Sequence, residues 1–247
     1  MVAANNAISN TVGASISGVT NTLTVTNPSN TASSAARETI VVGGGTAGDP
    51  TINWNVSGVT NWEMGIDNSA TDSLKISGGT ALGTNDTWIM DTSGRRTMPL
   101  QPCFSAYNAA NILNVTGNGT TYTFGTGGVL TLLINQSTSM TTAGVFTAPV
   151  TGNYLFCGSL IFYESGGPIA AAFNQGVVQI VTTLNTFQVN QFNPAACQNQ
   201  GGGSGFGFSV ILPMTAGNNA ILQCIVNGGA ATIDVRAGSI FSGFLLC

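Results

Sequence analysis

Apolar residues alternate with polar ones along most of this chain, and that alternation limits the fold more than any other feature. Stretches with this spacing occur at 23–25, 52–56, 62–66, 74–76, 177–183, 206–212, 220–226, 232–235 and 240–246. A period of two places every second side chain on one face of a β-strand. Turn-forming pairs such as Asn27-Pro28 and Asp49-Pro50 separate the stretches. With no helical periodicity beside them, these patterns predict an all-β fold.

Charge is scarce, which excludes several classes of function. The 247 residues include 9 acidic and 5 basic side chains and no histidine. Without histidine there is no Ser-His-Asp triad, no Cys-His pair and no histidine-based metal site. Asn, Thr, Ser and Gly take the place of charged residues, as is usual on the exterior of β-proteins. We therefore expect no enzyme, no cofactor and no metal site.

The few charges are unevenly distributed, and their distribution suggests a domain boundary. Beyond residue 100 only Glu164, Asp234 and Arg236 are charged. We place the boundary near Met98 to Pro102, between a β-rich attachment domain (1–100) and a second domain (101–247) long enough to bury its own core. A net charge of −4 without a basic cluster argues against nucleic acid and anionic membranes as partners.

Two local patterns resemble functional motifs but are better explained as turns. Gly43, Gly45 and Gly48 have the spacing of a dinucleotide fingerprint, with Asp67 following at a suitable distance. Asp49-Pro50 and an alternating stretch come next, whereas the fingerprint requires a helix, so we predict a glycine-rich hairpin loop after a strand-like segment at 38–42. Four carboxylates could supply a glycosidase pair, but each lies at an expected strand end and is interpreted as a turn residue. They are Asp67, Asp72, Asp86 and Asp91.

Three blocks in the second domain resemble the globular head of complement C1q and its tumour-necrosis-factor-like relatives. They are Phe104 to Tyr107, the G-x-F-x-A-P-x-x-G-x-Y-x-F pattern from Gly144 to Phe156, and S-x-F-S-G-F-L-L from Ser239 to Leu246. The resemblance implies a two-sheet jelly roll of eight to ten short strands that forms a homotrimer. It also makes Tyr154, Phe156 and Phe244 candidates for the trimer interface or for the core beneath it, and both alternatives stay open.

The chain departs from that family in ways that limit what can be transferred. No residue before 101 follows the glycine period of a collagen stalk, so a smaller N-terminal antiparallel β domain takes its place. Gly217-Asn218-Asn219 stands where some members have an acidic calcium ligand, so no metal site is carried over. The scarcity of charge also leaves the family's charge-dependent ligand recognition without side chains.

A second resemblance concerns residues 58–77. The segment from Gly58 to Ser69, continuing to Ser77, is similar to segments of structural and fibre proteins of bacteriophages and large DNA viruses. This resemblance implies a non-enzymatic virion protein, a homotrimeric capsid decoration or fibre. Its N-terminal domain would bind other virion proteins while the jelly-roll head projects.

Two alternatives and one expectation about location accompany this hypothesis. The opening residues lack the basic and apolar regions of a secretion signal, and no apolar run is long enough to span a bilayer. We therefore expect a protein made in the host cytoplasm and located at the virion surface. One alternative is a tail-fibre adhesin that binds a host glycan or receptor through aromatic side chains; the other is a secreted cytokine-like recognition protein. The aromatic candidates for the adhesin are Trp62, Trp88, Tyr122 and Tyr163.

The five cysteines cannot all pair within one chain. Cys157 and Cys224 lie in apolar stretches and are expected to be buried. The family resemblance implies that the first and last strands of the head are antiparallel neighbours, which would bring Cys103 and Cys247 within disulfide reach. A reducing cytosol would keep both thiols free, so the bridge and two free thiols remain as alternatives.

Overall fold

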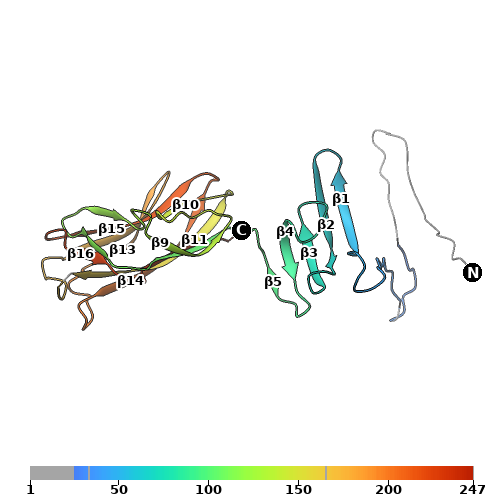
Figure 1. Cartoon of the computed structure of the whole chain (residues 1–247), viewed down its shortest axis with the longest axis horizontal. Coiled ribbons are helices and arrows are strands. Elements are labelled where there is room, and N and C mark those ends of the chain that lie inside the picture. The colour runs from blue at the N-terminus through green and yellow to red at the C-terminus, as the bar shows by residue number, and fades with distance from the viewer. Residues whose placement is uncertain (1–24, 33, 165, 247) are drawn as a thin grey trace, which may run out of the picture.

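The protein is all-β, as predicted, and consists of a single-layer sheet followed by a two-sheet sandwich. The computed structural model describes residues 25–32, 34–164 and 166–246, and within these ranges there is no helix. No helix that could cross a membrane is present among the described residues. Figure 1 shows the single sheet and the sandwich one after the other along the long axis of the molecule.

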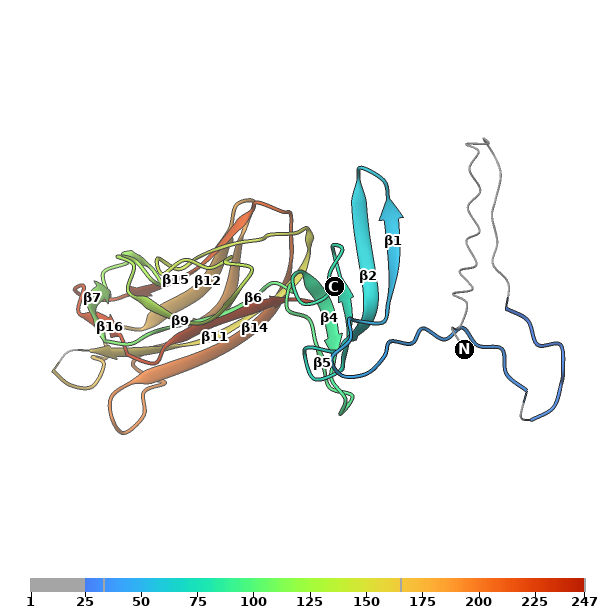
Figure 2. The same cartoon turned by 45° about the vertical axis from the view of Figure 1, so that its right-hand side comes forward.

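The first sheet is an antiparallel meander in which each strand pairs with the next along the chain. Its strands are β1 (Thr51–Val56), β2 (Thr60–Asp67), β3 (Ser73–Ser77), β4 (Asp86–Met90) and β5 (Arg96–Thr97). Short turns join them, and Gly58 supplies the positive φ that the β1–β2 turn requires. The strands stand side by side along the long axis and run across it, with β5 nearest the sandwich (Figure 1, Figure 2).

The meander is covered on its polar face, which reverses the usual arrangement. Glu63, Asp67, Lys75 and Ser77 point to this face and are buried, while the apolar side chains between them are half-buried or exposed. The segment before β1 contributes to the cover: the Ile66 amide donates to the Pro50 carbonyl at 3.3 Å. A side chain at position 65 would collide with that carbonyl, so Gly65 permits the close approach.

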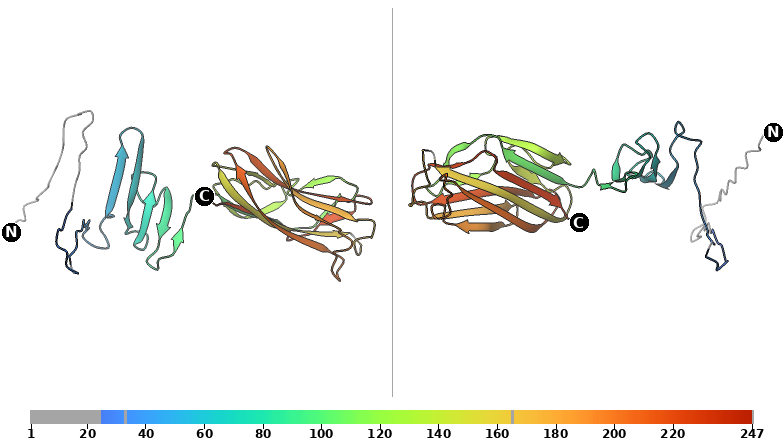
Figure 3. Two further views of the ribbon diagram at one scale, coloured as in Figure 1. Left: turned by 180° about the vertical axis from the view of Figure 1, so that it is seen from behind. Right: turned by 90° about the horizontal axis from the view of Figure 1, so that it is seen from below.

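The sandwich, called the head below, is a jelly roll built from two antiparallel sheets. In one sheet β7 (Ile112–Thr116), β16 (Ile233–Val235), β11 (Gly152–Glu164), β17 (Ile240–Leu245), β6 (Cys103–Asn108) and β9 (Leu130–Gln136) follow in that order, and β14 (Ser204–Met214) pairs with β11. The other sheet contains β10 (Val145–Thr147), β15 (Asn219–Asn227), β12 (Gln175–Thr182) and β13 (Thr186–Phe192), with β8 (Thr121–Thr123) beside β15. Figure 3 shows the two layers from behind and from below.

Aromatic rings fill the core between the two sheets. Phe104 stacks on Phe146 with ring centroids 4.9 Å apart, and Phe241 meets Phe104 edge-on at 5.0 Å. These rings leave no room for a side chain at Gly243, where an added Cβ would lie 2.7 Å from the ring of Phe104 and 2.9 Å from that of Phe156. The glycine of the closing motif is thus required by packing.

Several local expectations need correction. The head has more strands than the eight to ten expected, because β7, β8, β9 and β13 lie outside the alternating stretches and motif blocks of the sequence. Residues 38–42 form no strand, so the glycines at 43–48 make a turn from an unpaired segment into β1 rather than a hairpin loop. Val25 is likewise outside any strand, while residues 23 and 24 lie outside the described part of the chain.

Candidate interaction surfaces

The uncovered face of the first sheet gathers apolar side chains outside the core of the head. Alternation and register bring the even-numbered apolar side chains of β1, β2, β3 and β4 together on this face. We call it the tryptophan face, and its members are Ile52, Trp54, Val56, Trp62, Met64, Ile66, Leu74, Ile76, Trp88 and Met90. Trp54 is 52% exposed and Trp62 is 42% exposed. All three tryptophans of the chain lie here.

A buried ion network holds the opposite face of the sheet. The Lys75 ammonium lies between two carboxylates, 2.8 Å from Asp67 Oδ2 and 3.0 Å from Asp86 Oδ2. The second oxygen of Asp67 accepts hydrogen bonds from the Ser69 and Ala70 amides. The second oxygen of Asp86 accepts from the Ser77 hydroxyl and the Gly83 amide. Two connecting loops are thereby fixed over the polar face.

The network shifts the pKa of each member toward its charged form. The hydrogen bond from Lys75 is the main cause that lowers the pKa of Asp67. Burial alone would raise the pKa of Asp86, but hydrogen bonds from Ser77, the Gly83 amide and Lys75 outweigh it and lower that pKa. Burial would likewise lower the pKa of Lys75, yet its hydrogen bonds to the two carboxylates raise it. All three groups are therefore charged at neutral pH.

The carboxylates considered for glycosidase chemistry act in turns. Asp91 accepts hydrogen bonds from the Ser93 and Arg95 amides at 2.9 Å each, and Asp72 has the positive φ of a tight turn. Asp67 and Asp86 accept loop amides and share Lys75, a partner that sequence analysis missed. Alternation alone could not have revealed it, because a register shift between Ile76 and Ser77 is what brings position 86 to the face of positions 67 and 75. Among the described residues, no cluster of three or more metal-ligating side chains occurs, and the turn at Gly217 is no exception.

The three aromatic candidates of the head separate into two environments. Tyr154 and Phe156 are fully buried in the core of one chain, where the Tyr154 hydroxyl donates to the Val150 carbonyl at 2.8 Å. Phe244 points outward from the seven-stranded sheet and is 40% exposed. It lies beside Leu155 on the neighbouring strand, and Ile211 follows on the next. With Ile134 on β9, these side chains form an outward apolar area that we call the head patch.

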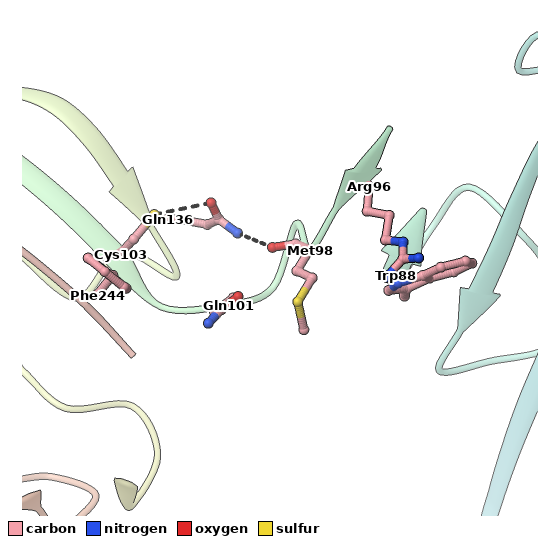
Figure 4. Close-up of a pocket in the computed structure, with 7 residues that line it drawn as sticks. All are labelled: Trp88, Arg96, Met98, Gln101, Cys103, Gln136 and Phe244. Carbon is pink, nitrogen blue, oxygen red and sulfur yellow. Dashed lines mark hydrogen bonds between the residues drawn. The ribbon is translucent and has the colours of Figure 1, made fainter. Parts of the chain in front are cut away.

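An open groove of about 510 Å³ lies where the sheet meets the head. Figure 4 shows its lining, with Trp88 and Arg96 from the first sheet on one side and Cys103, Gln136 and Phe244 from the head on the other. Trp88 belongs to the tryptophan face and Phe244 to the head patch. The two apolar surfaces therefore adjoin each other at this groove.

Side-chain hydrogen bonds fasten the connection between the two parts. Gln136 Nε2 donates to the Met98 carbonyl at 2.6 Å, and the Ser137 hydroxyl donates to the Leu100 carbonyl at 3.3 Å. Gln101 Nε2 reaches the Leu245 carbonyl on the last strand at 2.6 Å. The linker is thus tied to the base of the head.

The cysteines occupy different environments. Cys224 is fully buried, as expected, and its burial raises the pKa of the thiol to about 12. The expectation for Cys157 is wrong: Tyr154 and Phe156 point into the core, so position 157 points to the outer face and is partly exposed. The Cys103 thiol donates to Gln136 Oε1 at 3.3 Å. Cys247 lies outside the described residues, and the Cys103–Cys247 bridge stays a prediction.

The aromatic side chains considered for glycan binding are not gathered in one place. Tyr122 is buried in the core, and burial raises its pKa, so it is unavailable as a stacking platform. Tyr163 lines a small groove with Asn111 and Arg236 at a distance from the tryptophans along the head. Trp62 and Trp88 share the tryptophan face with Trp54, which sequence analysis did not include.

Comparisons with known proteins give similar solved structures but no family. No protein-family profile matches this chain, and no curated protein matches it. The chain is similar to the solved globular domain of zebrafish complement 1qA protein, with 14% identity over 60% of this chain and 98% of that one and a TM-score of 0.39. Eiger TNF from S. frugiperda shows 10% identity over 60% and 93% of the two chains, with a TM-score of 0.39. Murine APRIL at pH 8.5 shows 9% identity over 59% and 99%, with a TM-score of 0.38.

Proposed function

We propose that this chain is a non-enzymatic structural protein of a virus particle, a homotrimer that projects its jelly-roll head from the virion surface. The N-terminal part binds other virion proteins, and synthesis takes place in the host cytoplasm. The observation that carries the trimer is the head patch around Phe244, an apolar area on the outer face of a sheet. Apolar side chains of this kind favour burial against another surface.

Three further features support the role in a particle. The segment 58–77, which resembles phage and large-virus structural proteins, forms the central hairpin of the first sheet. The sheet and the head follow each other along one axis, as a projecting protein requires (Figure 1). The 5 basic residues leave trypsin-like proteases few sites to cleave, which suits a protein exposed outside a cell.

Light scattering of the purified chain tests the trimer. We expect a mass of three times the 25.1 kDa chain. Phe244→Asp places a carboxylate in the head patch and should shift the protein toward monomer on dilution. Leu184→Asp is the matched control, because Leu184 is more exposed but lies in the β12–β13 turn, away from the patch. A monodisperse monomer of the wild-type chain would contradict the proposal.

Gold-labelled antibodies against the head test the location. Regular labelling of intact particles from cultures that produce this chain is expected. The jelly-roll fold suits a secreted cytokine-like protein equally well. Detection of the chain in the culture medium, with no label on the particles, would favour that alternative. A glycan array tests the adhesin alternative, in which selective glycan binding would be lost on replacement of Tyr163, the half-buried aromatic candidate that lines a groove of the head.

A further inference from the structure

The tryptophan face is left uncovered by the rest of the described chain. Loops and the Lys75 network already cover the opposite side of the sheet, so these parts of the chain cannot also cover its apolar side. A single antiparallel layer has no core of its own and needs a second layer for stability. Soluble monomers rarely expose contiguous apolar patches above about 300–600 Å². This face extends over four strands, so a covering surface is required.

The chemical character of the tryptophan face indicates which kind of surface packs against it. Its members are apolar, and the one charged side chain in the same rows is Arg96 at the β5 edge, beside Trp88 (Figure 4). Such a face offers nothing to a charged partner and is complementary to another uncharged apolar face. The same face on a second copy of the chain meets this requirement.

The arrangement of the strands also favours a second copy of the chain as the partner. The strands cross the long axis and are stacked along it, so sheets from copies arranged around that axis can meet over their whole length (Figure 1). The tryptophan face is continuous with the head patch, because Trp88 and Phe244 line one groove. An interface between copies at the head patch can therefore extend onto the tryptophan face.

We propose that the tryptophan face packs against the tryptophan faces of two other copies, so that three sheets enclose an apolar column beneath the heads. This inference rests on the homotrimer proposed above and adds a second interface to it. The face is then unavailable to other virion proteins, and attachment to the particle must use another surface of the N-terminal part.

Intrinsic fluorescence tests the column directly. The 3 tryptophans all lie on this face, so the tryptophan emission of the full chain comes from the face alone. If the column forms, acrylamide quenches the emission of the native trimer several-fold less than that of the same chain unfolded in guanidinium. If the face stays open, quenching approaches that of the unfolded chain, because Trp54 and Trp62 are about half exposed in one copy.

A dilution series separates the possible outcomes. Mass and quenching are measured on the same samples, and we expect protection to disappear as the mass falls to that of one chain. A wild-type chain that is monomeric at every concentration overturns both proposals. A trimer with readily quenched tryptophans overturns the column and leaves the head trimer intact. Protection that persists in a dilute monomer overturns the column too, because a segment of the same chain then covers the face.

A pair of variants tests the face independently. Ile76→Asp places a charge in the middle of the face, on β3, and should increase quenching several-fold in the trimer or shift the chain toward monomer. Asn55→Asp is the matched control, since Asn55 is exposed and points to the opposite side of β1, next to Trp54 and Val56. Equal behaviour of the two variants would contradict the column. The wild-type measurement stands even if Ile76→Asp does not fold.

Discussion

At the scale of single residues, glycine placement determines how closely the core of the head can pack. Gly243 faces the rings of Phe104 and Phe156, and a methyl group there would lie within 3 Å of both rings. Gly243→Ala should therefore destabilise the head by about 1–3 kcal/mol, the range for overpacking a dense core. Denaturant unfolding followed by near-UV tyrosine signals measures the change, because all 4 tyrosines lie in the head.

A neighbouring serine provides the control for this substitution. Ser242 points to the outer face, where its hydroxyl donates to Ser105, so Ser242→Ala should cost much less. An equal loss in both variants would show that the rings of Phe104 and Phe156 can move aside.

At the scale of elements, the Lys75 network stabilises the first sheet by fixing its two loops. Lys75→Met leaves two buried carboxylates without their shared cation and should destabilise the sheet by about 3 kcal/mol, at the low end for breaking a buried ion pair because only one layer of loop covers it. Tryptophan fluorescence reports the sheet and tyrosine signals report the head. Loss of both signals at the same denaturant concentration, in wild type and variant alike, would contradict a separate effect on the sheet.

The same network makes the stability of the sheet depend on pH. The pKa values of Asp67 and Asp86 are lowered from 3.8, so the stability they contribute is present above 3.8 and is lost as the pH falls through their folded values. The pKa of Lys75 is raised from 10.5, so its contribution is lost as the pH rises beyond that value. We expect tryptophan signals to change below pH 3.8 before tyrosine signals do, and Lys75→Met should weaken this acid dependence.

Alternation in the sequence identifies strands but not the side of a sheet that is covered. The patterns at 52–56, 62–66 and 74–76 correctly predict β1, β2 and β3, and those at 206–212 and 220–226 correctly predict β14 and β15. The same patterns suggest that Trp62 and Ile76 are buried and Lys75 is exposed, whereas the structure has Lys75 buried and Trp62 exposed. The difference arises from loop contacts of Asp67 and Asp86, which lie between distant positions and leave no periodic signal. For the same reason, burial of Tyr122 and exposure of Phe244 could not be predicted from spacing.

At the scale of the whole molecule, the two apolar surfaces lie next to each other. The head patch and the tryptophan face belong to parts with separate hydrogen-bonded sheets, yet they meet at one groove. The chain has only 14 charged residues, so charge repulsion does little to prevent these surfaces from packing against other copies of the chain. The proposed assembly of copies would cover both surfaces.

The linker between the sheet and the head also has a mechanical consequence. Gln136 and Ser137 tie its backbone to β9 and the turn that follows, and Gln101 ties it to the last strand. A connection held in this way cannot act as a free swivel, so a pull or a twist applied to the head is transmitted to the strands below it. Viscous drag on a projecting head would then load the Lys75 network at the base of the molecule instead of being absorbed by rotation at the joint.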